Sequence, residues 1–424
     1  MSRLSEAMRG RSNSVRKNKD AVCLKKFDIQ TVLGEGAFGK VKLAVDKKTK
    51  QRYALKFMDK DHIISKNATA LVFTERMVLQ KLCHPYIVGL RYAFQDLDNL
   101  FMVLQLAKGG DLRFHMENSK TAFSKEGCLL YAAEICNAVG YMHTQKIIHR
   151  DLKPENILMD DMGHLYLTDF NLAVSVEERI PKSESGTATY MAPEMFLGTG
   201  YTYSVDWWAV GVILYECVYF KRPIKYNHDT DVYKVALMNE PIEFPSKGAH
   251  GPVEPNENRD SLIKGLLERD VSKRLGSDSD GHGYERTIKT HPYFESVNYE
   301  MLVQKKIEPP FKPRTENASD NVPTALIIDD LLEGGSEISQ KSKNGPGKVL
   351  SRMMSGLFKK KDENAIPKPK TKEEIERQNM LVHFTIFDFE APLQLPIILP
   401  DLTVWPSEPE TNIEGSQQKS GLTV

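Results

Sequence analysis

"IIHRDLKPENILMD", from Ile147 to Asp160, is the most specific stretch of this 424-residue chain. Within it, Asp151 precedes Asn156 by five residues, a spacing that suits a proton acceptor for a hydroxyl group followed by a ligand for a magnesium ion. Lys153, between them, would neutralise a phosphoryl group in transit. The segment "HLYLTDF" then predicts a strand that delivers Asp169 as a second metal ligand. Together these residues predict phosphoryl transfer.

A second motif, "GEGAFGKV", contains Gly34, Gly36 and Gly39. Three glycines at this spacing also mark dinucleotide-binding folds, where they open a helix. Here Val41 and Leu43 continue a strand-like alternation, which predicts a loop bent between two strands. Without side chains, such a loop lets backbone N–H groups approach nucleotide phosphates.

Lys56 lies among apolar neighbours in "YALKF", and Glu75 lies on the apolar face of a helix predicted for "LVFTERMVLQKL". A lysine whose stem merely follows an apolar surface is the ordinary alternative. Two opposite charges on buried faces are costly unless they pair. We therefore expect an ion pair that holds Lys56 against the α- and β-phosphates of a nucleotide.

The hydrophobic periodicity changes along the chain. From Phe27 to about residue 60, apolar and polar residues alternate around short turns, which predicts antiparallel strands. After about Gly110, apolar residues recur at helical spacing, as in "GCLLYAAEICNAVGYMHTQ". The pattern predicts an α+β fold in which a small strand-rich lobe precedes a larger helical lobe, with a ligand cleft between them.

Composition divides the chain into four zones. Residues 1–26 carry eight Lys and Arg against two acids, and we expect them to be disordered. Residues 27–294 are the expected globular domain, residues 295–389 mix short apolar clusters with loops, and residues 390–424 form a polar tail expected to be disordered. Over the whole chain, 57 basic and 57 acidic side chains cancel, so no global field favours a nucleic-acid partner.

The five cysteines are scattered and include no CxxC pair, which argues against a disulfide framework or a zinc site and favours a reducing compartment. No apolar run reaches the length that a membrane-spanning helix needs. We therefore expect a cytoplasmic protein, and we expect it to be a monomer.

Residues 27–294 resemble a eukaryotic protein kinase domain, because they contain "GEGAFGKV", "YALK", "HRDLKPEN", "TDFN", "MAPE" and "SVDWWAVGV". The resemblance implies a bilobal kinase fold and an enzyme that uses ATP and Mg2+. It also implies that Asp206 braces the backbone of the catalytic loop and that Glu194 pairs with Arg274, whereas His149 is expected in the core. The lysine after the Asp-Leu of the loop, and "GTATYMAPE", resemble serine/threonine rather than tyrosine kinases.

The resemblance assigns the site residues to three roles. The catalytic set is Asp151, Lys153, Lys56 and Glu75. The nucleotide-binding set is Leu33, Gly34, Glu35, Gly36, Ala37, Phe38, Gly39, Lys40, Val41, Lys56, Gln105, Ala107 and Asp111. The metal ligands are Asn156 and Asp169.

The segment "HPYFESVNYEMLVQKKIEPPFKP", followed later by "FTIFDF", is similar to the tail of the AGC kinase group. The Asp-Phe-Asn sequence at residues 169–171 and "DNVPTALIIDD" in the tail indicate the YANK kinases, within or beside that group. Asn171 replaces a glycine, and asparagine is among the residues that best tolerate left-handed backbone. We expect Asn171 to stiffen this switch, since the metal ligand Asp169 is intact.

A pseudokinase, which keeps the fold as a binding scaffold without turnover, is the alternative function. It is disfavoured because the residues that phosphoryl transfer needs are all present. They are Lys56, Glu75, Asp151, Lys153, Asn156 and Asp169.

Resemblance to basophilic AGC kinases suggests that Asp111, Glu155 and Glu216 face the substrate and favour arginines before the acceptor. The alternative is that Asp111 binds only ribose and that Glu216 is a satisfied helix residue. Arg150 needs an anionic partner in the activation segment. Ser183 lies near the expected place, and Ser185 and Glu184 beside it remain alternatives.

"HFTIFDFE" matches a hydrophobic motif in which Phe384 and Phe387 would dock beside the helix of Glu75. Asp388 stands where many relatives carry a phosphorylated Ser or Thr, and it supplies one negative charge without modification. An ordinary hydrophobic strand is the alternative.

Two basic segments offer further contacts. Residues 348–361, in "KVLSRMMSGLFKKK", predict a basic amphipathic helix that would bind an anionic membrane surface or a calmodulin-like groove, or else pack on the domain. The membrane alternative would place the protein at the periphery of membranes. Arg9 and Arg11 precede Ser12 and Ser14 by three residues each, which suggests autophosphorylation.

Overall fold

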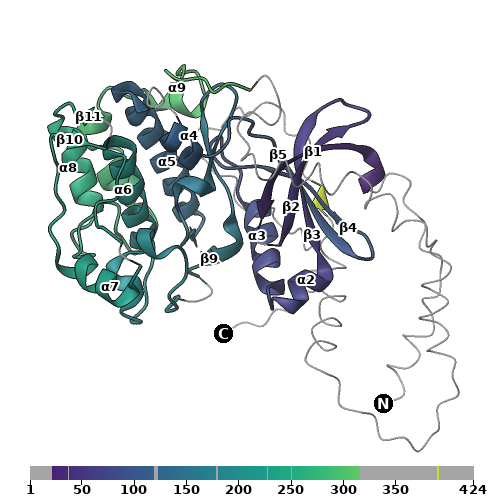
Figure 1. Ribbon diagram of the computed structural model, residues 1–424, viewed down its shortest axis with the longest axis horizontal. Helices are drawn as coiled ribbons and strands as arrows, with labels where there is room; N and C mark the ends of the chain where they lie inside the picture. The colour runs from purple at the N-terminus through teal and green to yellow at the C-terminus, as the bar shows by residue number, and fades with distance from the viewer. Residues whose placement is uncertain are drawn as a thin grey trace, which may run out of the picture. The chain divides into compact units, whose positions relative to one another are not determined.

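The computed structural model describes residues 22–36, 38–118, 123–177, 180–226, 228–249, 251–315 and 389–390. A strand-rich lobe comes first and a helical lobe follows, as the periodicity predicts (Figure 1). The six-stranded sheet of the first lobe has the order β1-β2-β3-β5-β4-β12. Its strands are β1 (Phe27–Gly36), β2 (Gly39–Asp46), β3 (Arg52–Asp59), β4 (Leu90–Gln95), β5 (Asn99–Gln105) and β12 (Phe389–Glu390).

All pairings in this sheet are antiparallel. Side chains of β5 alternate between two apolar clusters, because successive residues of a strand point to opposite faces. Leu100, Met102 and Leu104 join the main core, which also contains residues of α3 (Thr69–Lys81), whereas Phe101 and Val103 join a second cluster. A short helix, α2 (Lys60–Ser65), connects β3 to α3.

The second lobe is mainly helical. Its helices are α4 (Leu112–Asn118), α5 (Lys125–Thr144), α6 (Ser204–Tyr219), α7 (Thr230–Asn239), α8 (Glu257–Leu266) and α9 (Tyr299–Val303). Short two-stranded pairings join β6 (Ile147–Ile148) to β9 (Val174–Ser175), β7 (Ile157–Met159) to β8 (Leu165–Leu167), and β10 (Lys247–Gly248) to β11 (Gly251–Pro252).

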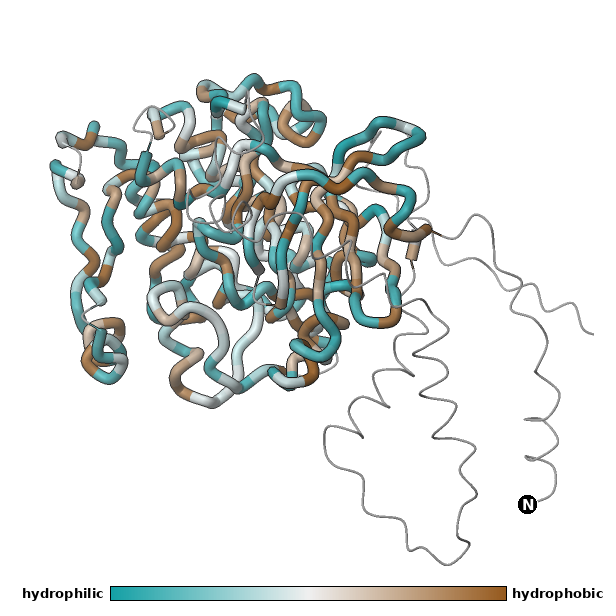
Figure 2. The backbone as a smooth tube through the Cα atoms, turned by 45° about the vertical axis from the view of Figure 1, so that its right-hand side comes forward, coloured by the Kyte–Doolittle hydropathy of each residue, from teal (hydrophilic) through white to brown (hydrophobic). Residues whose placement is uncertain are grey.

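Helices α5 and α6 form the centre of this lobe, and almost every side chain of α6 is buried, including Trp207 and Trp208. A helix that is apolar on all sides requires cover on all sides. Hydrophobic stretches accordingly concentrate inside both lobes, and hydrophilic stretches at the outer turns (Figure 2). None of the described helices is long and apolar enough to cross a membrane.

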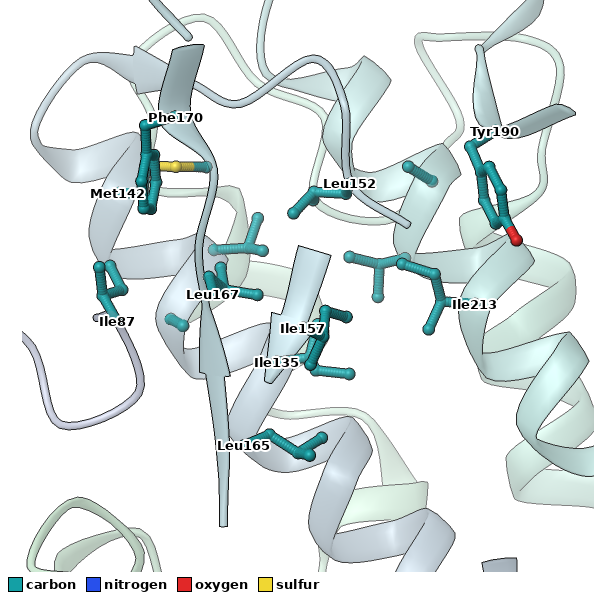
Figure 3. Close-up of a cluster of buried hydrophobic side chains, with 14 of the residues drawn as sticks. Ile87, Ile135, Met142, Leu152, Ile157, Leu165, Leu167, Phe170, Tyr190 and Ile213 are labelled. Atoms are coloured by element: carbon teal, nitrogen blue, oxygen red, sulfur yellow. The ribbon is translucent and has the colours of Figure 1, made fainter. Parts of the chain in front are cut away.

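The apolar core continues directly beneath the stretch that begins at Ile147. Figure 3 shows Leu152, Ile157, Leu167 and Phe170 converging there, and all four are at most 1% exposed. Burial on this scale fixes the backbone from which the polar side chains of the site project. Sequence positions far apart are thereby held on one rigid platform.

Candidate active site

Lys56 of β3 and Glu75 of α3 form the expected ion pair. The Lys56 Nζ atom lies 2.8 Å from Glu75 Oε1 and 2.7 Å from Oε2. Both residues are buried. Burial by itself lowers the pKa of Lys56, but the carboxylates of Glu75 and Asp169 outweigh it and hold that pKa above its usual value. The ammonium group is therefore charged and fixed in position.

The glycine-rich segment bends between two strands, as expected. Antiparallel pairing places Gly34 opposite Val41, Glu35 opposite Lys40, and Gly36 opposite Gly39. The other members of the expected nucleotide loop are Leu33 in β1, Phe38, which is buried, and Ala37, which lies outside the described residues.

Only part of this loop requires glycine for packing. A Cβ atom on Gly39 would lie 1.9 Å from the backbone oxygen of Phe57, so no other residue fits there. A Cβ atom on Gly34, by contrast, would have no atom within 4 Å. The space above Gly34 is open, which suits a loop whose backbone approaches a ligand.

Asp151 is the centre of a network of hydrogen bonds. Its Oδ2 atom accepts from Lys153 Nζ at 2.9 Å and from Asn156 Nδ2 at 3.1 Å. Its Oδ1 atom accepts from the backbone N–H and the hydroxyl of Thr187, both at 2.8 Å. Three of the expected residues, Asp151, Lys153 and Asn156, are thus brought together, and the carboxylate is held in one orientation.

Thr187 is a site residue that sequence reasoning missed. Its hydroxyl also lies 2.9 Å from Lys153 Nζ, so it links the activation segment to the catalytic loop. The preceding Gly186 has φ 110°, and a Cβ atom there would lie 2.3 Å from the backbone oxygen of Arg150. The glycine-threonine pair in "GTATYMAPE" was the sequence signal for this contact, because only glycine at position 186 lets the backbone come so close to Arg150.

Asp206 braces the backbone of the same loop, as expected. Its carboxylate accepts from the backbone N–H groups of His149 and Arg150 at 2.8 and 2.9 Å, and it lies 2.9 Å from His143 Nε2. Burial alone would raise the pKa of Asp206. The two histidines and these hydrogen bonds lower it by more, so the pKa of Asp206 lies below its usual value. His149 is fully buried against Phe170, as expected for a core residue.

Glu194 and Arg274 form the second expected architectural pair. Arg274 Nη1 donates to Glu194 Oε1 at 2.5 Å, and Nη2 donates to Oε2 at 2.9 Å. Both side chains are at most 10% exposed. This bidentate pair joins the segment after Met191 to the part of the helical lobe that follows α8.

The two expected metal ligands offer the donors that a hard divalent cation prefers. Asp169 Oδ1 is buried and has no hydrogen-bond partner among the described residues. Asn156 donates through Nδ2 to Asp151, which leaves its amide oxygen for another contact. An orphaned buried carboxylate oxygen is costly unless a cation compensates it. Asp169 and Asn156 therefore fit a bound divalent metal ion.

The backbone of Asn171 is not left-handed. Asp169 has φ 62° and takes the left-handed conformation, whereas Asn171 lies in the 3-10 turn Phe170–Leu172 and has no positive φ. The chain reverses at Asp169, so the third position of the motif does not need the freedom of glycine. Asn171 therefore does not use the left-handed backbone that asparagine tolerates, and no hydrogen bond of its side-chain amide occurs within the described residues. That Asn171 stiffens the switch stays a prediction.

The segment that connects the lobes contains Gln105, Ala107 and Asp111. Gln105 ends β5, and its backbone N–H donates to the Gly89 carbonyl at 2.9 Å. Ala107 packs against the main core. Asp111 Oδ1 accepts from the backbone N–H of Phe114 at 2.7 Å, so this carboxylate satisfies the start of α4.

Glu155 and Glu216 converge, but on a residue of the chain itself. Arg113 of α4 donates to Glu155 Oε1 at 3.0 Å and to Glu216 Oε2 at 3.2 Å. Glu216 also accepts from the Tyr190 hydroxyl and lies 3.4 Å from Arg222 Nε. Sequence reasoning missed Arg113, because nothing in its local pattern distinguishes it from a solvated helix residue.

Arg150 is connected to the activation segment through Tyr201. Its Nε donates to the Leu172 carbonyl at 2.6 Å, and Nη1 donates to the Tyr201 hydroxyl at 3.4 Å. That hydroxyl in turn donates to the Ser183 carbonyl at 2.8 Å. Glu184 pairs instead with Lys234 at 3.3 Å. This chain of bonds links Arg150 to the backbone of Ser183, whereas the Ser183 hydroxyl lies 3.1 Å from that of Ser185.

Several expected sites lie outside the described residues. They are Ser12, Ser14, residues 348–361, Phe384, Phe387 and Asp388. Immediately after Asp388, β12 pairs with β4, with Phe389 opposite Ala93 and Glu390 opposite Tyr92.

Comparison with known proteins identifies a matching family and several similar proteins. The family model of the protein kinase domain matches residues 27–294. The chain is 39% identical over 301 residues to RAC serine/threonine-protein kinase of Drosophila melanogaster, covering 70% of this chain and 47% of the relative. It is 38% identical over 299 residues to serine/threonine-protein kinase Sgk1 of Gallus gallus, covering 69% and 66%. It is 37% identical over 305 residues to protein kinase 2 of Dictyostelium discoideum, covering 72% and 61%. The chain thus spans between about half and two thirds of the length of these curated relatives.

Proposed function

Because this chain belongs to the protein kinase family, we propose that it is a serine/threonine kinase that transfers the γ-phosphoryl group of ATP to protein hydroxyls. The observation that carries the proposal is the oriented carboxylate of Asp151, held by Lys153, Asn156 and Thr187. These hydrogen bonds hold the carboxylate in one orientation, and a general base has to be positioned in this way to meet the hydroxyl that it deprotonates. The serine/threonine class also agrees with the names of the relatives.

Asp151 would accept the proton of the acceptor hydroxyl as that oxygen attacks phosphorus. Lys153, at 2.9 Å from Asp151, would stabilise negative charge on the phosphoryl group during transfer. Lys56, oriented by Glu75, would bind the α- and β-phosphates. These groups act by position and charge, so the reaction needs no covalent intermediate on the chain.

A protein kinase domain implies a divalent metal ion, and we propose that Mg2+ binds Asn156 and Asp169. When bound, the ion would neutralise the phosphate oxygens. The buried oxygen of Asp169 supports this assignment, because no described residue donates a hydrogen bond to it. The pseudokinase alternative has no observation in its favour, since each of these side chains is present and in place.

We propose a finer placement in the YANK branch, within or beside the AGC group. It rests on Asp-Phe-Asn at residues 169–171 and on the tail sequence "DNVPTALIIDD". Activation would involve an anion at Ser183, the residue linked to Arg150 through Tyr201. Mass spectrometry that finds Ser183 unmodified in the fully active protein would remove that assignment.

A cytoplasmic monomer that acts on protein substrates remains our proposal for the cellular setting. Residues 348–361 would contact an anionic membrane surface, a calmodulin-like groove or the domain itself, and these alternatives stay open. Flotation with liposomes of anionic composition distinguishes the first alternative from the other two.

The proposed function is tested by finding out which acceptor residue, Ser, Thr or Tyr, receives the phosphate. The full chain is incubated with ATP and Mg2+ and with three peptides that differ only in carrying Ser, Thr or Tyr. We expect phosphate on the Ser and Thr peptides only, and its loss in Asp151→Ala. Transfer to Tyr alone, or equal transfer by Asp151→Ala, would refute the proposal.

A further inference from the structure

Arg113 connects three segments at the edge of the catalytic loop. It extends from the first turn of α4 to Glu155 in the 3-10 turn Pro154–Asn156, to Glu216 in α6, and to the Tyr190 hydroxyl. Its side chain is 21% exposed, which leaves it partly desolvated. Burial lowers the pKa of Arg113, but Glu216, Tyr190 and Glu155 outweigh that effect and raise it. The guanidinium is therefore a permanent charge at this position.

Arg113, Arg222, Glu155 and Glu216 form a quartet whose formal charges balance. Asp111 also interacts electrostatically with Arg113 and Glu155. Arg113 and Arg222 supply two positive charges against the carboxylates of Glu155 and Glu216. Tyr190 donates to Glu216 as well. Both carboxylates are thus already engaged, and a further cation would gain little attraction from this quartet.

The quartet includes the turn that follows Asp151, the residue that an acceptor hydroxyl would have to reach. Glu155 is adjacent to Asn156 and four residues from Asp151, which the acceptor hydroxyl has to reach. An extended peptide advances about 3.3–3.6 Å per residue. Residues a few positions from the acceptor would therefore cross Glu155, whose side chain is 41% exposed.

We infer that Arg113 is a specificity-determining residue that occupies, from within the chain, the place that an arginine of the acceptor peptide would otherwise take between Glu155 and Glu216. The inference rests on the proposed function. A guanidinium binding two carboxylates is the interaction that a basic substrate would supply. Since the chain provides its own, acceptor peptides gain no affinity from an arginine at this point. This inference is an alternative to the basic preference that resemblance to AGC kinases implies.

The experiment compares matched serine peptides that carry either Arg or Ala at each of about five positions before the acceptor. The ratio of kcat/KM values, Arg over Ala, is measured for the wild-type chain and for Arg113→Met, which keeps an apolar stem and removes the charge. We expect a ratio within about twofold of one for the wild type. In Arg113→Met the ratio should rise about tenfold at one position, because Glu155 and Glu216 become available.

Arg286→Met is the matched control. Arg286 pairs with Asp278 and Asp280 and touches neither Glu155 nor Glu216, so the ratio should stay near one. A wild-type ratio above ten, or an unchanged ratio in Arg113→Met, would overturn the assignment. If Arg113→Met does not fold, Arg113→Gln, which also removes the charge but keeps a polar side chain, is measured in its place.

Failure of the proposed function is distinguishable from failure of this inference. If the wild type phosphorylates no peptide, the activity proposal fails. Fluorescence anisotropy with labelled Arg and Ala peptides then decides the inference. Equal dissociation constants for the wild type, and tighter Arg-peptide binding by Arg113→Met, support it, and tighter Arg-peptide binding by the wild type contradicts it.

Discussion

Asp151 and Thr187 are joined by two hydrogen bonds of 2.8 Å, one from the backbone N–H and one from the hydroxyl of the threonine. The two residues are 36 positions apart, so the activation segment is folded back onto the catalytic loop. The same hydroxyl lies 2.9 Å from Lys153. Orientation of the proton acceptor therefore depends on a residue outside its own loop.

Thr187→Val keeps the shape of the side chain and removes the hydroxyl. We expect kcat to fall about 10- to 100-fold, because Asp151 and Lys153 each lose an orienting contact. Thr187→Ser restores the hydroxyl and should recover most of the activity. Steady-state kinetics on a serine peptide measure both variants, and wild-type kcat in Thr187→Val would show that the bond is dispensable.

The buried pair of Lys56 and Glu75 should be strongly coupled in stability. Glu75→Leu leaves a buried ammonium without its main partner, so the free energy of unfolding should fall by about 3–5 kcal/mol. The double variant with Lys56→Met should lose less than the sum of the two single variants. Urea unfolding of all four proteins gives the cycle.

The exposed pair of Lys289 and Glu285 is the control for that cycle. It lies on the surface at 2.7 Å, and Glu285→Leu should change the unfolding free energy by less than about 0.5 kcal/mol. Additive losses at Lys56 and Glu75 would contradict the coupling.

Lys305 should make stability depend on alkaline pH. Its ammonium lies 3.6 Å from the Tyr166 ring centroid and 3.8 Å from Asp160 Oδ2, and burial lowers its pKa to about 8. Between that value and the ordinary 10.5, the unfolded chain holds a proton that the folded chain has released. Stability attributable to this residue therefore rises with pH across the window.

Lys305→Met should remove the destabilisation that results from burying the charged Lys305 ammonium. Below pH 8 the variant should be more stable than the wild type, by at most on the order of 3 kcal/mol, and the difference should vanish as pH rises past about 10.5. Denaturant unfolding at several pH values measures it, with the exposed Lys306→Met as control. A stability difference that does not change with pH would contradict the prediction.

Asn171→Gly tests the third position of the Asp-Phe-Asn sequence. Since Asn171 has no positive φ, glycine adds freedom to the unfolded chain without relieving strain, and stability should fall by roughly 0.5–1 kcal/mol. ATP affinity should change by less than about threefold in calorimetric titrations, because Asp169 is untouched. A large loss of ATP affinity would mean that Asn171 takes part in nucleotide binding.

The sequence was sufficient wherever a contact follows from a local pattern. The pairing of Lys56 with Glu75 was predictable because both lie on apolar faces, where an unpaired charge is costly. The strands around Gly39 were predictable from alternation. The role of Asp206 followed from family resemblance, and the structure shows its bonds to His149 and Arg150.

The features of the site that the sequence did not predict depend on the tertiary fold. Arg113 lies 42 residues from Glu155 and 103 from Glu216, and no periodicity in its own helix indicates that they meet. The sequence likewise did not indicate that the left-handed residue of this stretch is Asp169 and not Asn171, two residues later. Such features are decided by how the activation segment and α4 pack on the catalytic loop.

A single-turnover measurement of phosphoryl transfer by the wild type and Asp151→Asn directly tests whether Asp151 is the proton acceptor of an active kinase. Enzyme in excess is mixed with labelled ATP, Mg2+ and a serine peptide, and the dissociation constant for ATP is measured in parallel. The wild type should phosphorylate the peptide, and Asp151→Asn should do so about 100- to 10,000-fold more slowly with similar ATP affinity. Equal transfer rates in the two proteins, or ATP binding without any transfer by the wild type, would contradict the assignment of this chain as an active kinase.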